Sequence, residues 1–94
     1  MPTYIMLGRL TAQAKHNMSE AMKVRDQIWA QYQKKGIKIT PYTTMGQYDV
    51  VNIIESPTEE LAMQFLMAAG AAGNIDSTTL RAFTAQEMGK INSA

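Results

Sequence analysis

The stretch Met45-Gly46-Gln47-Tyr48-Asp49-Val50-Val51 decides the fold. Its glycine turn is followed by β-branched residues, which predict a strand over 48–55. A second strand-like run, 37–44, precedes the turn, so the two runs predict a β-hairpin. Pro41 cannot donate a ladder hydrogen bond, and the first of these strands should therefore lie at a sheet edge or carry a bulge. Asp49 stands at the head of the other strand although aspartate is a poor strand former, which calls for a physical reason.

The rest of the chain alternates between strand and helix patterns. The expected elements, in order, are a strand over 3–10, a helix over 12–35, strands over 37–44 and 48–55, a helix from 57 to about 70–73, a strand over 74–83 and a short helix to about 92. This order predicts an α+β, ferredoxin-like βαββαβ fold with a short C-terminal helix, formed by residues 1–94 as a single domain. Right-handed crossovers should place both long helices on one face of the sheet.

The first helix has clear end signals and one internal ambiguity. Thr11 is a candidate N-cap, and Gly36 is a typical residue just beyond a helix C-terminus. Asn17 and Glu20 have the spacing of a second capping box, so the helix either runs unbroken or divides near Asn17.

The two later helices also begin at recognisable signals. Ser56 is expected to cap the second long helix, with Pro57 at its first position and Glu59 returning to the cap. Thr84 and Glu87 form the same kind of box ahead of the final helix.

Composition excludes several classes of function. Nine basic and eight acidic side chains nearly cancel, which argues against nucleic-acid and anionic-membrane partners. There is no cysteine and one histidine, so disulfides and thiolate chemistry are excluded and neither a metal site nor a cofactor is expected. The N-terminus lacks signal-peptide features and no apolar stretch has transmembrane length, which predicts a cytoplasmic protein.

Both faces of the expected sheet are apolar. In the first strand, Ile5 and Leu7 lie on one side, while Tyr4, Met6 and Leu10 lie on the other. Two helices cover only one face, and an exposed second face would leave roughly 300–500 Å² of apolar surface bare, or on the order of 10 kcal/mol at about 25 cal/mol per Å². We therefore expect a homodimer or higher homo-oligomer associated through the sheet. The alternative is a monomer whose final helix folds over that face, although such a helix is too short to cover four strands.

The sequence resembles the GYD-domain family over almost its whole length. The resemblance is carried by four segments: Tyr4-Ile5-Met6-Leu7-Gly8, Gly46-Gln47-Tyr48-Asp49-Val50-Val51, Gly73-Asn74-Ile75 and Thr78-Thr79-Leu80-Arg81-Ala82-Phe83. It implies a small prokaryotic protein, hence a bacterial origin, with a dimeric α/β-barrel fold in which two ferredoxin-like sheets face each other. The family has no settled activity, so the resemblance implies no catalytic residues.

Tyr48, Asp49 and Arg81 are the first candidate ligand-binding residues. Neighbours on a strand alternate in direction, so Tyr48 and Asp49 should face opposite ways. Asp49 is either a general base or ligand anchor, or a structural residue that holds Arg81 or a backbone amide. With Arg81 as its counter-ion at one sheet end, the set would bind a small carboxylate or phenol.

His16 and Arg25 are further candidates, each with a simpler interpretation. His16 could serve acid–base chemistry, but near a helix break it is more often a surface or capping residue. Arg25 lies within the apolar stripe of the first helix, where it either reaches a ligand or lays its stem along the core. Trp29 is expected to fill the core or, alternatively, to stack on an aromatic ligand.

Three functions are compatible with these features. The first is a homo-oligomeric protein that binds a small carboxylate or aromatic ligand between sheet and helices. The second is a cofactor-free enzyme, monooxygenase- or isomerase-like, that uses Asp49 and Arg81. The third is an assembly or regulatory partner protein without a pocket of its own.

Overall fold

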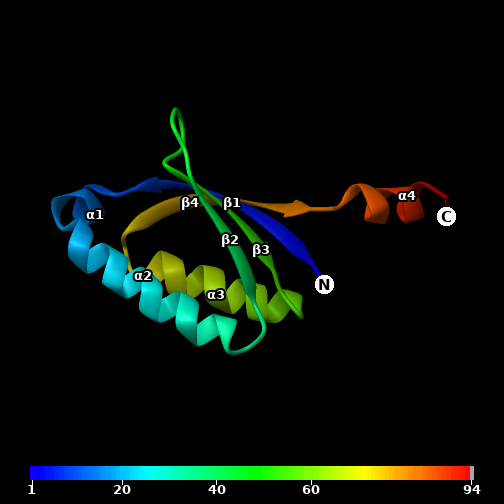
Figure 1. The fold of residues 1–94 in the computed structure, drawn as a ribbon, viewed down its shortest axis with the longest axis horizontal. Coiled ribbons are helices and arrows are strands. Elements are labelled where there is room, and N and C mark those ends of the chain that lie inside the picture. The colour runs from blue at the N-terminus through cyan, green and yellow to red at the C-terminus, as the bar shows by residue number, and fades with distance from the viewer. Residues whose placement is uncertain (94) are drawn as a thin grey trace.

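The computed structural model describes residues 1–93 and places two layers, one of strands and one of helices (Figure 1). The elements are β1 (Thr3–Leu10), α1 (Ala12–His16), α2 (Met18–Gln33), β2 (Lys38–Thr43), β3 (Val50–Glu55), α3 (Glu59–Ala71), β4 (Ile75–Ala82) and α4 (Ala85–Ser93). The sheet order is β2-β3-β1-β4, and every neighbouring pair is antiparallel. The predicted ferredoxin-like fold is confirmed.

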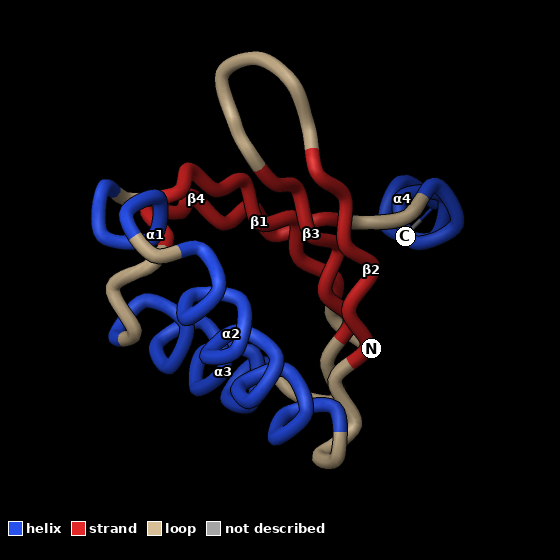
Figure 2. Tube along the Cα trace, turned by 60° about the vertical axis from the view of Figure 1, so that its left-hand side comes forward, coloured by secondary structure: helices blue, strands red, loops and turns tan. Residues whose placement is uncertain are grey.

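The two long helices, α2 and α3, cover the same face of the sheet, as expected (Figure 2). Strand β2, which carries Pro41, lies at an edge. The proline prediction is therefore confirmed, because an edge strand tolerates a residue without an N–H donor.

The first helix divides at Asn17. The Asn17 side chain accepts a hydrogen bond from the Glu20 backbone N–H at 3.3 Å, which starts α2, while Thr11 caps α1 through the Ala14 N–H at 3.2 Å. The broken-helix alternative is the observed one. Helix α2 ends at Gln33, and Gly36 follows with a φ of +104°, a conformation that suits glycine.

Three predicted boundaries are wrong by two residues: the end of the first helix, expected at 35, and the two described next. Strand β3 begins at Val50, because Tyr48 and Asp49 belong to the hairpin loop, which Thr44 closes by donating its hydroxyl to the Tyr48 carbonyl at 2.6 Å. Helix α3 begins at Glu59 with Thr58 as its N-cap. Ser56 does not cap it, because its hydroxyl donates instead to the Thr58 carbonyl at 2.7 Å.

The core lies between the sheet and the two long helices. Alternate residues of β1 point into it, so that Tyr4 and Met6 are buried with Ile54 of β3. From the helices, Tyr32 and Phe65 pack with tilted rings whose centroids are 5.4 Å apart.

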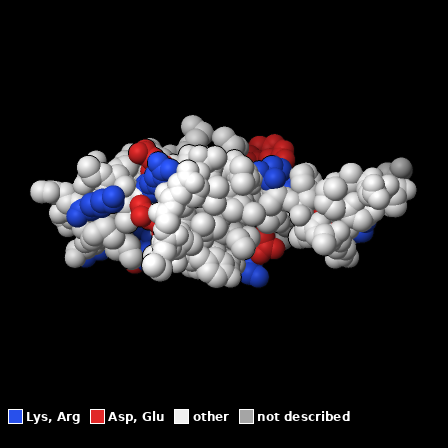
Figure 3. All heavy atoms as spheres, turned by 90° about the horizontal axis from the view of Figure 1, so that it is seen from above, with Lys and Arg blue, Asp and Glu red and all other residues white. Residues whose placement is uncertain are grey.

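The other face of the sheet is open and apolar. Cross-strand partners share a face, so Ile5 lies between Ile53 and Leu80, and Leu7 lies beside Val51. The Leu80 side is substantially exposed, at 48%. Viewed from the side opposite α2 and α3, the molecule is mostly uncharged, with small scattered groups of charge (Figure 3).

Helix α4 does not cover this open face. It extends beyond the end of the sheet, and none of its described residues is buried (Figures 1 and 2). The chain consequently has a radius of gyration of 14.3 Å, against about 12 Å for a compact chain of this length. The alternative in which the final helix closes the sheet within one chain is therefore wrong.

Candidate functional site

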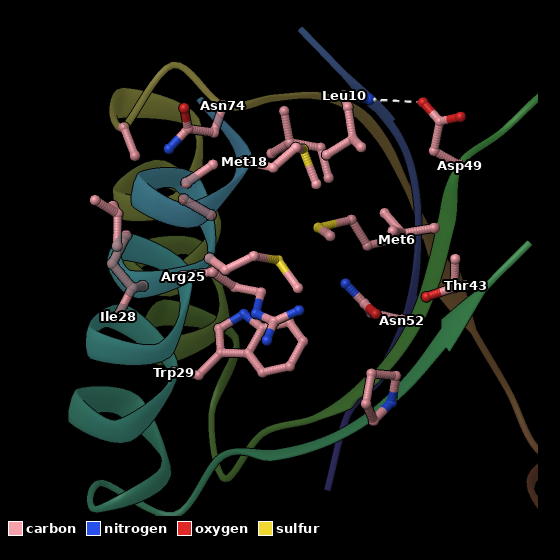
Figure 4. A pocket seen from close by; sticks show the side chains of 18 of the residues that line it. Met6, Leu10, Met18, Arg25, Ile28, Trp29, Thr43, Asp49, Asn52 and Asn74 are labelled. Carbon is pink, nitrogen blue, oxygen red and sulfur yellow. Dashed lines mark hydrogen bonds between the residues drawn. The ribbon is translucent and has the colours of Figure 1, made fainter. Parts of the chain in front are cut away.

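A cavity of about 340 Å³ lies between α2 and the sheet (Figure 4). Helix α2 forms one wall with a face of residues spaced three and four apart: Met18, Ala21, Met22, Arg25, Ile28 and Trp29. The opposite wall comes from the strands and includes Met6, Val50 and Asn52. This volume is at the small end of ligand pockets, which span roughly 300–1,000 Å³.

Asn52 is the most informative residue of the cavity. It sits in the middle of β3, only 4% exposed, and its side-chain amide projects into the cavity (Figure 4). Within residues 1–93 no group hydrogen-bonds to this amide, yet no fully enclosed side-chain nitrogen or oxygen lacks a partner. Both observations hold together because the polar atoms of Asn52 face the open space of the cavity.

Arg25 and Trp29 form a stacked pair on the helical wall. The guanidinium carbon of Arg25 lies 4.7 Å from the centroid of the Trp29 ring. Its Nη2 is 2.8 Å from Asp26 Oδ1, an ion pair at the surface. In Figure 4 the Arg25 guanidinium and the Asn52 amide extend into the cavity from opposite walls. Arg25 thus reaches the cavity as well as lying along the helix.

Asp49 has a structural role at the end of the sheet. Its Oδ2 accepts the Leu10 backbone N–H at 2.8 Å, and its own N–H donates to the Gly8 carbonyl at 2.9 Å (Figure 4). Asp49 therefore extends the hydrogen bonding between β1 and β3 by one residue, to the position that precedes Val50. This explains why a poor strand former stands here, and it matches the interpretation that Asp49 holds a backbone amide.

Arg81 does not pair with Asp49. Strands β3 and β4 are both antiparallel to β1, so the start of β3 and the end of β4 lie at opposite ends of the sheet. Arg81 is paired in register with Tyr4, four residues or about 13 Å along β1 from Gly8. Its guanidinium lies 3.8 Å from Glu59 and stacks on Phe83 at 4.4 Å. The expected Asp49–Arg81 pair is wrong, and the two residues cannot contact one small ligand together.

Tyr48 and His16 also lie apart from the cavity. The Tyr48 ring lies in the hairpin loop beneath the Arg9 guanidinium, at 5.4 Å. His16 ends α1 and is exposed, beside a separate open hollow that Asn17 also lines. Among residues 1–93, no group of three His, Cys, Asp or Glu side chains has the arrangement of a metal site.

The sequence interpretation did not single out Asn52. One signal was available, because Asn52 is the polar residue in the run Val50-Val51-Asn52-Ile53-Ile54, and asparagine is depleted in strands. Asn52, which is buried and has no side-chain partner in the described part of the chain, is a better site indicator than nearby Asp49, whose carboxylate already accepts a backbone N–H.

No helix of the described residues has the length and hydropathy needed to span a bilayer.

Comparison with known proteins gives a family and a fold. The family model described as GYD domain matches residues 4–91. The crystal structure of TTHA0845 from Thermus thermophilus is similar, with a TM-score of 0.61 and 18% identity over 90% of this chain and 96% of the other. A designed protein with a ferredoxin fold, LFR1 1, has a TM-score of 0.56 and 14% identity, covering 89% and 86% of the two chains. No curated protein matches this sequence. At these identities, the two solved structures establish the fold alone.

Proposed function

This chain belongs to the GYD domain family, and we propose that it is a homo-oligomeric protein that binds a small carboxylate or aromatic ligand between α2 and the sheet. The observation that supports this proposal is the Asn52 amide, which has no hydrogen-bond partner within residues 1–93 and faces a cavity of about 340 Å³. The polar atoms of Asn52 face this cavity instead of a protein partner, so water serves them in the free protein and a ligand can take over the same hydrogen bonds.

The open sheet face supports self-association as the second part of this function. The row Ile53–Ile5–Leu80 and the neighbouring row Val51–Leu7 form a continuous apolar surface. Charged pairs of both signs lie at its margins, including Lys38 and Glu55 at 3.7 Å. A surface with an apolar centre and charges of both signs at its rim can pair with an identical copy across a two-fold axis, because apolar centres meet and opposite charges can face each other. A second copy of the chain is therefore the occupant that we propose.

Sedimentation velocity tests the assembly. We expect a particle larger than the 10.4 kDa chain at micromolar concentration, and Leu80→Glu should shift it toward the monomer because it would bury an unpaired charge. The matched control is Met67→Glu on the outer side of α3, where a charge should change nothing. A wild-type particle of 10.4 kDa at high concentration would contradict the assembly.

Thermal unfolding with a ligand panel tests binding. Small aromatic acids, phenols and quinones should include compounds that raise the melting temperature, because a ligand that binds only the native state stabilises it, by about 2.7 kcal/mol at roughly 100 times its Kd. Ala69→Leu, which fills part of the cavity, should weaken the effect, whereas Met63→Leu on the outside of the same helix should not. If no compound shifts the transition, or if both variants behave alike, the proposed function is wrong.

A further inference from the structure

We infer that the ligand is a planar aromatic ring bearing one carboxylate, held between the Arg25 guanidinium and the Asn52 amide. This inference rests on the proposed function and names its substrate class. Three observations carry it: the hydrogen-bonding groups left unused in the cavity, the sign of the available charge and the chemistry of the apolar wall.

The first observation concerns the groups that are free to bind. The Asn52 amide offers both a donor and an acceptor with no partner among residues 1–93. Arg25 donates to Asp26 from Nε and Nη2, which leaves both N–H groups of Nη1 and the second one of Nη2. Because both residues extend into the cavity, a carboxylate between them can accept from the guanidinium with one oxygen and from the amide with the other (Figure 4).

The second observation concerns charge. Arg25 is the cation and Asp49 is the anion among the residues that line the cavity. The Asp49 carboxylate already accepts the Leu10 N–H at the far end of the cavity. Asp49 keeps its negative charge at that end, and Arg25 shares its positive charge with Asp26, so the anionic group of a ligand is favoured beside the free donors of Arg25 and away from Asp49.

The third observation concerns the apolar wall. Three of the eight methionines, Met6, Met18 and Met22, line the cavity together with the indole of Trp29. In Figure 4, Met6 and Met18 lie on different walls of the space above the Arg25–Trp29 pair. Thioethers make favourable contacts with aromatic rings and adapt to their shape, so this lining favours an unsaturated ring over an aliphatic chain.

Titration calorimetry with three matched probes tests this ligand class. The probes are 2-naphthoate, its neutral analogue 2-naphthylmethanol and its saturated analogue decahydro-2-naphthoate. We expect 2-naphthoate to bind more tightly than either analogue, by about tenfold for the loss of the charge. Arg25→Met should reduce the affinity for 2-naphthoate by about tenfold and leave 2-naphthylmethanol unchanged. Lys23→Met, an exposed change on the same helix, is the matched control and should alter neither affinity.

A separate variant tests the contact between Asn52 and the ligand. Asn52→Leu should weaken both 2-naphthoate and 2-naphthylmethanol, because the amide serves either oxygen; Asn52→Ala gives the same test if the leucine variant does not fold. Equal binding of the acid and the alcohol, or an Arg25→Met variant with unchanged acid affinity, would overturn the aromatic-acid assignment while leaving ligand binding intact. Tight binding of the saturated acid would overturn the aromatic part. If none of the three probes binds, the aromatic-acid assignment is wrong, and the broader panel of thermal shifts decides the proposed function separately.

Discussion

Replacing Asn52 by leucine should stabilise the ligand-free protein. The side chain lies in the centre of β3, is 4% exposed and has no hydrogen-bond partner among residues 1–93. A fully enclosed amide without a partner costs roughly 1–3 kcal/mol relative to water, and Asn52, whose polar atoms face the cavity, bears part of this cost, which leucine of similar size removes. Part of the amide keeps contact with the cavity, so we expect a gain near the lower end, about 1 kcal/mol. For a domain of this size that corresponds to a rise in melting temperature of about 4–8 °C.

Urea unfolding followed by far-UV circular dichroism measures this change at one fixed protein concentration, since self-association would make stability depend on concentration. The midpoint should rise with an unchanged slope. Asn74→Leu is the matched control, because Asn74 also lines the cavity but its side chain accepts a hydrogen bond from Gln13 at 3.3 Å. That variant should gain nothing. A loss of stability in Asn52→Leu would refute the reasoning, because it would mean that the folded protein satisfies the amide.

Three further predictions concern the frame around the cavity and the final helix. Asp49→Ala should lower the free energy of unfolding by about 1–2 kcal/mol, because the Leu10 N–H loses its acceptor; Asp49→Asn should lose less, and equal losses in urea unfolding would count against this role. Gly8→Ala should cost about 1–3 kcal/mol in the same assay, since its Cβ would clash with the Ile75 side chain, with Cγ1 at 2.8 Å, and with Val50 Cγ2 at 2.9 Å; a neutral result would mean that these side chains can move aside. The hydrogen bond from the Thr84 backbone lowers the pKa of Glu87, so its contribution to α4 is present above the ordinary carboxyl pKa and is lost as the pH falls through the lowered value. Amide protection factors in α4, which correct for the intrinsic effect of pH on exchange, should fall over that acidic range in the wild type but not in Glu87→Gln, and equal profiles of protection against pH would contradict the cap.

Local signals such as helix caps and proline predicted the fold because each acts on residues next to it in the sequence. Asn17 caps whatever helix begins after it, and Thr84 with Glu87 forms the predicted box, with hydrogen bonds of 2.9 and 3.1 Å. Pro41 excluded a central strand through its missing donor. The start of α3 was mispredicted because two residues competed for one role and Thr58 rather than Ser56 capped the helix. The start of β3 was mispredicted because Thr44 closes the hairpin loop around Tyr48.

The candidate site was predicted less well because it depends on how elements meet. The Asp49–Arg81 pair failed because charge complementarity was considered without the direction of the strands, which places the two residues at opposite sheet ends. Arg25 was identified from its place in an apolar stripe, but its neighbour across the cavity comes from β3, 27 positions later. Whether Asn52 has a partner is a property of the packed protein, and no local pattern reports it.

The methionines on the cavity wall make the site sensitive to oxidants. Met18 and Met22 are 40% and 41% exposed, so peroxide can reach their thioethers, whereas Met6 is shielded at 3%. Conversion to the sulfoxide would place a polar, chiral S–O group where the wall is now soft and apolar. Oxidation of Met18 and Met22 would therefore change the α2 wall of the cavity, whereas the buried side chain of Met6 would stay unoxidised.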